Sequence, residues 1–302
     1  MQKDVVIIGS GPAGLSAGIY AIRAGFDALI VERTGLGGGQ VLNTYEVDNY
    51  PGLPGINGFD LGTKMYEHVE SLGLEVVACD VARVENTEGW KVLHTSKGEI
   101  KAKALVIATG ANHAKLNVKG ENEFAGKGVS YCATCDGAFF RERTVAVVGG
   151  GDVAVEDAIF LAGMCEKVYL IHRRDELRAA KRLQEKLLSQ ENVEIIWDTV
   201  VHSIEGHDKV ESLKLQNITS KAVQELAVSG VFVAIGMNPE TGLFRGIVEM
   251  DSDGYIKADE NCETNQPGIV VAGDARTKRL RQIVTAVADG ANAIYSLEKY
   301  LR

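Results

Sequence analysis

The residues best suited to chemistry in this sequence are Cys132 and Cys135, which lie two residues apart in the stretch YCATCDG. A Cys-x-x-Cys pair can form a redox disulfide, supply half of a metal site, or consist of two buried thiols. A structural zinc site needs four ligands. The sequence has no second Cys-x-x-Cys, and the nearest histidine, His113, lies 19 residues upstream. The redox disulfide is favoured, and the zinc site and the buried thiols stay open as alternatives.

Asp136 directly follows the second cysteine and is a candidate general acid or base for thiol chemistry. The stretch also predicts a short helix that starts at the cysteines, where a helix N-terminus lowers a thiol pKa. Cys79, Cys165 and Cys262 stand singly in apolar or strand-like stretches. We expect these three to be structural residues without a chemical role.

Two glycine-rich turns, which start about 140 residues apart, define the elements that position this chemistry. The first turn follows the apolar run 5–8, and a helix over 15–24 and a strand over 27–32 come after it. The second follows the apolar run 144–148, and a helix and a strand that exits within 167–174 come after it. The order strand, turn, helix, strand predicts two βαβ units, and therefore two dinucleotide sites in one chain.

The first turn has the G-x-G-x-x-G pattern, which lets a pyrophosphate lie against the N–H groups of a helix N-terminus. Glu32 ends the next strand, 18 residues after Gly14, where a carboxylate accepts hydrogen bonds from the ribose hydroxyls of an unphosphorylated adenosine. This predicts FAD or NAD and not NADP; an ordinary tight turn with a surface glutamate is the alternative. The residues of the turn are Gly9, Gly11, Pro12, Ala13 and Gly14.

The second turn has the G-x-G-x-x-A variant of this pattern, and the strand after it ends in basic residues in place of a glutamate. We expect Arg174 and Arg178, four residues apart, to share one face of a helix. Guanidinium groups suit a 2′-phosphate, so this site should prefer NADPH to NADH, whereas a solvated charge run is the alternative. The candidate residues are Gly149, Gly151, Asp152, Ala154, His172, Arg173, Arg174 and Arg178.

Composition narrows the class of protein. A chain of 302 residues with 45% apolar residues has room for two buried cores. A net charge of −9 gives no electrostatic reason to expect nucleic acid or an anionic membrane as a partner. No apolar run approaches the roughly 20 residues of a membrane span. The odd count of five cysteines, with one close pair, does not resemble a secreted disulfide framework, so we expect a cytoplasmic protein.

The ordered set of motifs resembles the low-molecular-weight, bacterial-type thioredoxin reductases, which are flavoprotein disulfide reductases. The resemblance covers nearly the whole chain, and the Cys-Ala-Thr-Cys at its centre makes it specific. Its motifs are GSGPAG, GGGQ (37–40), DNYPG (48–52), VIATGA (106–111), CATCDG, GGGDVAVEDA, HRRDELRA, GVFVAIG, GIVVAGDA and RQIVTA.

This resemblance implies an α/β fold with two Rossmann-like dinucleotide-binding domains, the NADPH domain being inserted into the FAD domain. In this family the inserted domain rotates on two linkers so that the disulfide and the nicotinamide reach one flavin in turn. Gly236, Pro239 and Gly242 fit a hinge or a plain loop equally well. The implied ranges are 1–113 and 241–302 for FAD, 114–240 for NADPH with the Cys-x-x-Cys, and linkers near 112–116 and 237–243.

The resemblance also implies roles for individual residues. Cys132 and Cys135 would form the redox-active disulfide, with Asp136 as its acid-base partner. Because Asp136 adjoins Cys135, we expect Cys135 to lie near the flavin and Cys132 to be the thiol that attacks the partner. The second-turn residues would bind NADPH, and no metal is implied. The FAD residues would be Gly9, Gly11, Gly14 and Glu32 for pyrophosphate and ribose, Gln40, Asn49, Arg281, Gln282 and Ile283 for the flavin, and Gly273 and Asp274 for the ribityl-pyrophosphate.

The implied activity is transfer of electrons from NADPH through FAD and the Cys132–Cys135 disulfide to the disulfide of thioredoxin, by a homodimer. The intact HRRDELR stretch disfavours ferredoxin as the electron donor. Two alternatives remain. The partner could be a dithiol protein other than thioredoxin, or the chain could be a flavin-binding interaction protein without catalytic activity.

Overall fold

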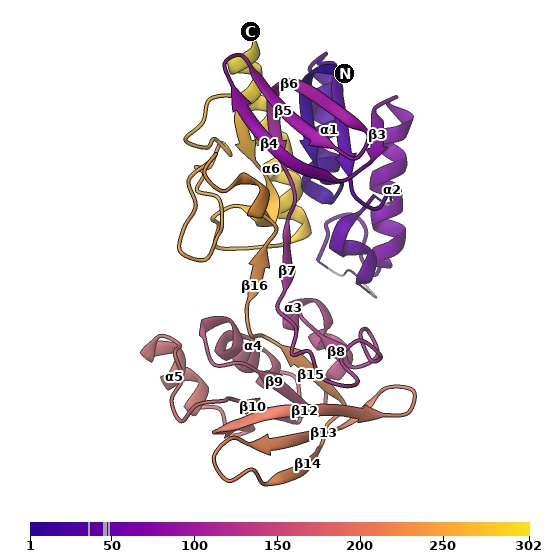
Figure 1. Ribbon diagram of the computed structural model, residues 1–302. Coiled ribbons are helices and arrows are strands. Elements are labelled where there is room, and N and C mark those ends of the chain that lie inside the picture. Colours follow the sequence, from indigo (N-terminus) through magenta and orange to yellow (C-terminus); the bar gives the residue numbers. More distant parts are fainter. Residues whose placement is uncertain (36, 45–46, 48) are drawn as a thin grey trace. The chain divides into compact units, whose positions relative to one another are not determined.

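The computed structural model of the chain describes residues 1–35, 37–44, 47 and 49–302 (Figure 1). Asp48, in the DNYPG motif, lies outside the described residues. The chain forms two compact units, of which unit 1 comprises residues 1–112 and 238–302 and unit 2 comprises residues 113–237. Unit 2 is therefore inserted into unit 1 along the chain.

A parallel sheet forms the centre of unit 1. The strands run in the order β3-β2-β1-β6, and β17 pairs with the far side of β6. The apolar run of β1 is buried on both faces, as expected for a parallel strand covered on both sides. The strands are β1 (Gln2–Ile8), β2 (Ala28–Glu32), β3 (Glu75–Ala78), β6 (Gly98–Ile107) and β17 (Ile269–Val271).

Successive residues of β1 face two different cores. Val5 and Ile7 pack with the helices α1 (Pro12–Arg23) and α6 (Ile283–Leu301), which lie against each other (Figure 1). Val6 and Ile8 pack toward an antiparallel extension that leads from β6 into two further strands. Unit 1 also contains β4 (Val81–Thr87), β5 (Trp90–Thr95) and α2 (Gly58–Ser71).

Unit 2 has its own parallel sheet, in the order β11-β10-β9-β15-β8, and a separate antiparallel sheet, β12-β13-β14. Val145 and Val147 of β9 pack with α4, and Ala146 and Val148 face the antiparallel sheet. The parallel strands are β8 (Val129–Ser130), β9 (Thr144–Val148), β10 (Lys167–Ile171), β11 (Val193–Ile196) and β15 (Gly230–Val233). Unit 2 also contains α3 (Ala133–Asp136), α4 (Asp152–Ala162), α5 (Lys181–Leu188), β12 (Thr199–Gly206), β13 (Val210–Asn217) and β14 (Val223–Ala227).

Both predicted βαβ units are present, so the α/β class with two Rossmann-type units is confirmed. Helix α1 begins earlier than predicted, because Pro12 occupies the first helical position, where its missing N–H leaves no bond unmade. The chain passes between the units through β7 (Ala111–His113) and β16 (Met237–Pro239), which form a two-stranded sheet. Among the described residues, no helix has both the length and the apolar character of a membrane span.

Candidate redox and cofactor sites

The carboxyl edge of the parallel sheet in unit 1 gathers several of the predicted FAD residues. Strand β1 pairs in parallel with β2 and β6, and β17 pairs in parallel with β6. Strand β1 ends just before Gly9, β2 ends at Glu32, and β17 ends two residues before Gly273. Gly9 has a φ of +104°, and a Cβ there would overlap the carbonyl oxygen of Ala108. A Cβ on Gly14 would overlap the carbonyl of Gly9 in the same way. Glycine is required at both positions for the turn to lie this close to the sheet and the helix.

Glu32 lies beside this turn and accepts hydrogen bonds from it. Its Oε2 accepts the Ser10 N–H at 2.9 Å and the Ser10 hydroxyl at 2.7 Å, and its Oε1 accepts the Thr34 N–H at 3.2 Å. The side chain is only partly buried, so a carboxylate is presented at the end of β2 next to the glycine turn. Ser10 is fully buried and had no signal of its own in the sequence.

Three buried polar atoms near the carboxyl edge and the start of α6 have no hydrogen-bond partner among the described residues: Thr109 Oγ1, Asp274 Oδ1 and Arg281 Nε. Buried polar atoms nearly always have a partner, so such orphans mark places where a bound group is expected. Burial raises the pKa of Asp274 above its ordinary value, and the charges of Lys278 and Arg281 counteract part of this. These donors and acceptors fit the hydroxyl-rich and heteroaromatic parts of FAD.

The remaining predicted flavin residues lie close to the start of α6. Asn49 donates its amide N–H to Gln282 Oε1 at 2.9 Å, so the structure brings these two together across 233 positions of the sequence. The Arg281 guanidinium lies 4.0 Å from the centre of the Tyr255 ring, a residue that the sequence did not single out. Ile283 is the first residue of α6, and Gln40 is exposed in the short 3-10 helix Gly39–Asn43.

In unit 2 the carboxyl edge of the parallel sheet brings the cysteine pair to the same side as the second glycine turn. Strands β8, β9 and β10 belong to one parallel sheet, and Cys132, Gly149 and His172 follow their carboxyl ends. Cys132 and Cys135 form a disulfide with their Cα atoms 5.3 Å apart. The redox alternative of the sequence is therefore the one present. Helix α3 starts after Cys132 as predicted. A helix of four residues is too short for its dipole to lower the pKa of a thiol as expected.

Asp136 is held beside the disulfide by Ser130, whose hydroxyl donates to Asp136 Oδ2 at 2.6 Å. The other oxygen, Oδ1, is buried and has no partner in the described part of the chain. Burial raises the pKa of Asp136, and the Ser130 hydrogen bond offsets this only in part. A half-buried carboxyl group with a raised pKa holds a proton closer to neutral pH, which suits a proton donor and acceptor for thiols.

His172 is buried against the second glycine turn, and a Cβ on Gly150 would overlap its ring. Burial lowers the pKa of His172, so the ring is neutral at neutral pH. Its Nε2 has no hydrogen-bond partner in the described structure. The edge of Trp197 lies against it, with the ring centres 6.3 Å apart. The buried packing residue Ala154 and Gly151, the N-cap of α4, complete the predicted turn.

The prediction that Arg174 and Arg178 share a helix face is wrong. Residues 172–180 are irregular, and helix α5 begins only at Lys181. The segment is tied to the glycine turn instead, because the Arg178 N–H donates to the Gly150 carbonyl at 2.7 Å and the Ala180 N–H donates to Asp152 Oδ1 at 2.7 Å. The carboxylate of Asp152 thus holds the arginine segment against the turn.

The three arginines of this segment, Arg173, Arg174 and Arg178, are exposed, and none forms an ion pair with another residue that the structure describes. Their guanidinium donors lie next to a nucleotide-type turn and are therefore available for an anionic ligand.

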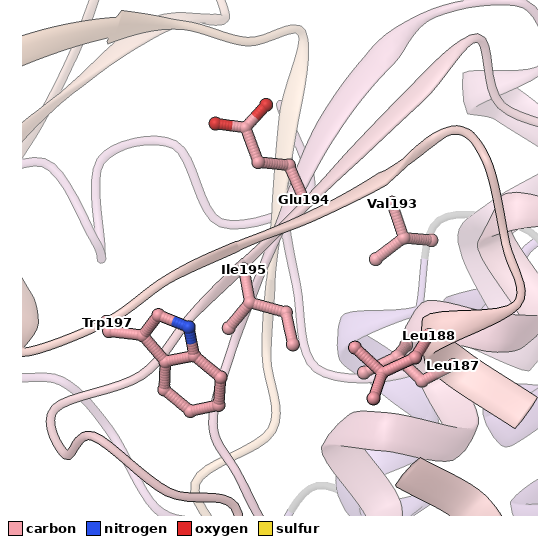
Figure 2. Close-up of a pocket in the computed structure, with 6 residues that line it drawn as sticks. All are labelled: Leu187, Leu188, Val193, Glu194, Ile195 and Trp197. Carbon is pink, nitrogen blue, oxygen red and sulfur yellow. The ribbon is translucent and has the colours of Figure 1, made fainter. Parts of the chain in front are cut away.

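Two other features of the molecule involve none of the predicted site residues. A pocket of about 310 Å³ in unit 2 has none of the predicted site residues in its lining (Figure 2). Cys79, Cys165 and Cys262 are buried and free, as predicted. Burial raises the pKa of Cys165 to about 11 and that of Cys262 to about 12, so neither is a reactive thiolate at neutral pH. The pocket is lined by Leu187, Leu188, Val193, Glu194, Ile195 and Trp197.

Comparison with known proteins extends these observations. Residues 3–290 match the pyridine nucleotide-disulphide oxidoreductase family. A thioredoxin reductase from Peptoclostridium litorale is 47% identical over 99% of this chain and 96% of its own length. The crystal structure of thioredoxin reductase from Streptococcus pyogenes has a TM-score of 0.94 and 45% identity, and the match covers 99% of this chain and 98% of that one.

A more distant structural match concerns the electron donor. The structure of a ferredoxin-flavin thioredoxin reductase from Clostridium acetobutylicum has a TM-score of 0.52 and 32% identity, over 99% of this chain and 98% of that one. The matches to both kinds of reductase extend over both units, and a disulfide follows β8 in unit 2. The chain is an oxidoreductase that belongs to the pyridine nucleotide-disulphide oxidoreductase family.

Proposed function

We propose that this protein is an NADPH-dependent thioredoxin reductase that uses FAD and the Cys132–Cys135 disulfide. The observation that carries the proposal is the position of this disulfide at the carboxyl edge of the same sheet that presents the second glycine turn. Bound FAD would supply the transfer of a hydride's electron pair from NADPH to the disulfide. The similarity to thioredoxin reductases over 99% of the chain supports thioredoxin as the protein substrate.

The residues at the disulfide can perform the thiol steps without another protein group. Reduction by two electrons and two protons opens the Cys132–Cys135 bond to two thiols. The Cys132 thiolate attacks one sulfur of the thioredoxin disulfide, forms a mixed disulfide and releases the other sulfur as a thiolate, which takes a proton. The Cys135 thiolate then attacks Cys132 Sγ, restores the internal disulfide and releases reduced thioredoxin. Asp136, with its raised pKa, gives and takes the protons of these thiols.

The nucleotide site follows from the charges around the second turn. The exposed guanidinium groups of Arg173, Arg174 and Arg178 would bind the 2′-phosphate of NADPH, and His172, neutral and buried, would pack under the adenosine. In unit 1, Glu32 would bind the ribose of FAD. The buried atoms of Asp274, Thr109 and Arg281 that have no hydrogen-bond partner in the described structure would form hydrogen bonds with the bound cofactor. A ferredoxin-dependent reductase would have no use for the three arginines.

The experiment is a turnover assay with purified protein and FAD. We expect oxidation of NADPH to require oxidised thioredoxin and to be much slower with NADH. Oxidation of NADPH that does not depend on thioredoxin would refute the substrate, and turnover with reduced ferredoxin in place of NADPH would refute the donor. We further propose a cytoplasmic homodimer, which light scattering of the holoprotein would test.

The partner can also be trapped. With Cys135→Ser, Cys132 attacks but the mixed disulfide is not resolved. We expect thioredoxin in a covalent complex that reductant releases. Another dithiol protein in the trap, with thioredoxin absent when both are offered, would assign the other partner.

A further inference from the structure

A buried cluster of three charged side chains joins α6 to the turn that carries Asp274. The side chains of Asp289, Arg276 and Lys278 are only 7%, 8% and 7% exposed. Asp289 Oδ2 accepts a hydrogen bond from Arg276 Nε at 2.9 Å and from Lys278 Nζ at 2.7 Å. A second guanidinium nitrogen of Arg276 donates to Asp289 Oδ1 at 3.2 Å, so the arginine binds both oxygens of the carboxylate.

The same carboxylate also holds the backbone immediately before Asp274. The Gly273 N–H donates to Asp289 Oδ2 at 3.0 Å. Gly273 has a φ of +76°, and a Cβ there would lie 2.9 Å from the Cβ of Ala13 in the first glycine turn. Residues on both sides of Asp274 are thereby fixed by one side chain of α6, and Asp274 has little freedom to move.

The charges of the cluster show that Asp289 is ionised in the folded protein. Burial opposes its ionisation, but the hydrogen bonds from Arg276 and Lys278 outweigh this and hold the pKa of Asp289 below its ordinary value. A buried ion pair adds little net stability, because desolvation of the charges offsets their attraction. The hydrogen bonds of the cluster do fix the position and orientation of the groups that they join. Here they fix the turn that carries Asp274, whose Oδ1 has no hydrogen-bond partner among the described residues.

We infer that Asp289 is a positioning residue for FAD: it fixes the Gly273–Ala275 turn so that Asp274 meets the ribityl-pyrophosphate part of the cofactor. Asp289 lies on α6, the helix that begins next to Arg281 and Gln282. Its hydrogen bond with Gly273 therefore also fixes the position of this turn relative to the residues predicted to contact the flavin. The inference rests on the proposed use of FAD. Asp289 itself contacts protein groups only, among the described residues.

The test is the dissociation constant of FAD from the apoprotein, measured by quenching of flavin fluorescence. Asp289→Asn keeps the shape and one acceptor but removes the charge. We expect it to weaken FAD binding by about tenfold or more, as for loss of a hydrogen bond to a charged group. The matched control is Ser296→Ala, which removes the hydrogen bond from another buried side chain of α6 to the Asn261 carbonyl, 2.8 Å long, and leaves the turn alone. The control should bind FAD within about twofold of the wild type.

Combining Asp289→Asn with Asp274→Ala distinguishes positioning of Asp274 from a purely structural role of Asp289. If Asp289 acts through Asp274, Asp289→Asn should change FAD binding by less than about threefold once Asp274 is already removed. Equal losses in the presence and absence of Asp274, or equal losses in the Ser296→Ala control, would overturn the inference. So would unchanged FAD binding by a folded Asp289→Asn.

If Asp289→Asn does not fold, Arg276→Lys takes its place, because it keeps the charge and removes the two-pronged contact. It should also weaken FAD binding, with the same dependence on Asp274, and an affinity equal to that of the wild type would overturn the inference. The wild-type titration distinguishes the two levels of the argument. A wild type that does not bind FAD refutes the proposed function, whereas a wild type that binds FAD alongside variants that bind equally well refutes only the role of Asp289.

Discussion

The two glycine turns of this chain have the same backbone setting and opposite electrostatics. Each follows a buried parallel strand, precedes a helix and lies at the carboxyl edge of its sheet. In unit 1 the next strand ends in Glu32, whose carboxylate accepts two hydrogen bonds from Ser10. In unit 2 the next strand leads to exposed arginines that have no ion-pair partner in the described structure. We propose that the shared turn provides a dinucleotide site in each unit, and that the residues at the exit of the second strand select the nucleotide.

The units also differ in the state of their cysteines. Unit 2 has a disulfide after β8 with a half-buried carboxyl group beside it, whereas Cys79 and Cys262 of unit 1 are buried free thiols. The thiol–disulfide exchange step should therefore use groups of unit 2, whereas binding of FAD should use groups of unit 1, and removal of groups in each unit should give separable effects.

The largest effect is expected from Cys132→Ser. We predict that thioredoxin reduction falls by at least about 1,000-fold, since the attacking thiolate is lost, while bleaching of the flavin by NADPH is retained. Stopped-flow absorbance and steady-state turnover measure the two. Cys165→Ala, at a buried free thiol of the same unit, is the control and should retain turnover. Retained turnover in Cys132→Ser would show that the pair is not the electron outlet.

Asp136→Asn should reduce thioredoxin turnover by about 100-fold, the size of a general acid-base contribution. Because burial raises the pKa of Asp136, the protonated form persists above its ordinary range and is lost as the pH rises through the raised value. The wild-type rate of the thiol step should therefore fall over that interval, and the variant should lack this fall. A pH–rate profile of the variant that keeps the wild-type shape would assign the titration to another group.

The combined change of Arg173, Arg174 and Arg178 to Gln should raise KM for NADPH by about 50-fold, because three charged donors to a phosphate are removed. KM for NADH should stay unchanged, since NADH lacks the 2′-phosphate. Lys186→Gln removes an exposed positive charge from α5 in the same unit and serves as the control for net charge. Equal losses with the two nucleotides would contradict the selectivity assigned to these residues.

Glu32→Gln should weaken FAD binding by about tenfold through loss of charged hydrogen bonds, with KM for NADPH unchanged. Flavin fluorescence during titration of the apoprotein measures this. Glu75→Gln, an exposed change on the neighbouring strand β3, is the control. An effect of Glu32→Gln on NADPH affinity equal to that on FAD would remove the distinction between the two turns.

The sequence predicted what depends on local patterns. Buried strands and glycine turns follow from apolar runs and residues with restricted roles, and the strand 144–148 has the predicted bounds. The arginine segment was not predicted, because its path is set by hydrogen bonds to the Gly150 carbonyl and the Asp152 side chain, which no helical spacing reveals.

The supporting residues of the sites were also beyond the sequence. Ser10, Tyr255 and Asp289 act through partners that the fold brings close, in the last case the backbone of Gly273, 16 positions away. Thr109 was part of a quoted motif, but its orphan hydroxyl becomes visible only when burial and partners are known. Periodicity and motif spacing carry no information on such contacts.

The measurement that tests the central claim most directly is anaerobic mixing of the FAD-loaded wild type with NADPH or with NADH at equal concentration. The account predicts that NADPH bleaches the flavin much faster than NADH does, because only NADPH has the phosphate that Arg173, Arg174 and Arg178 would bind. Equal bleaching rates with the two nucleotides would contradict it.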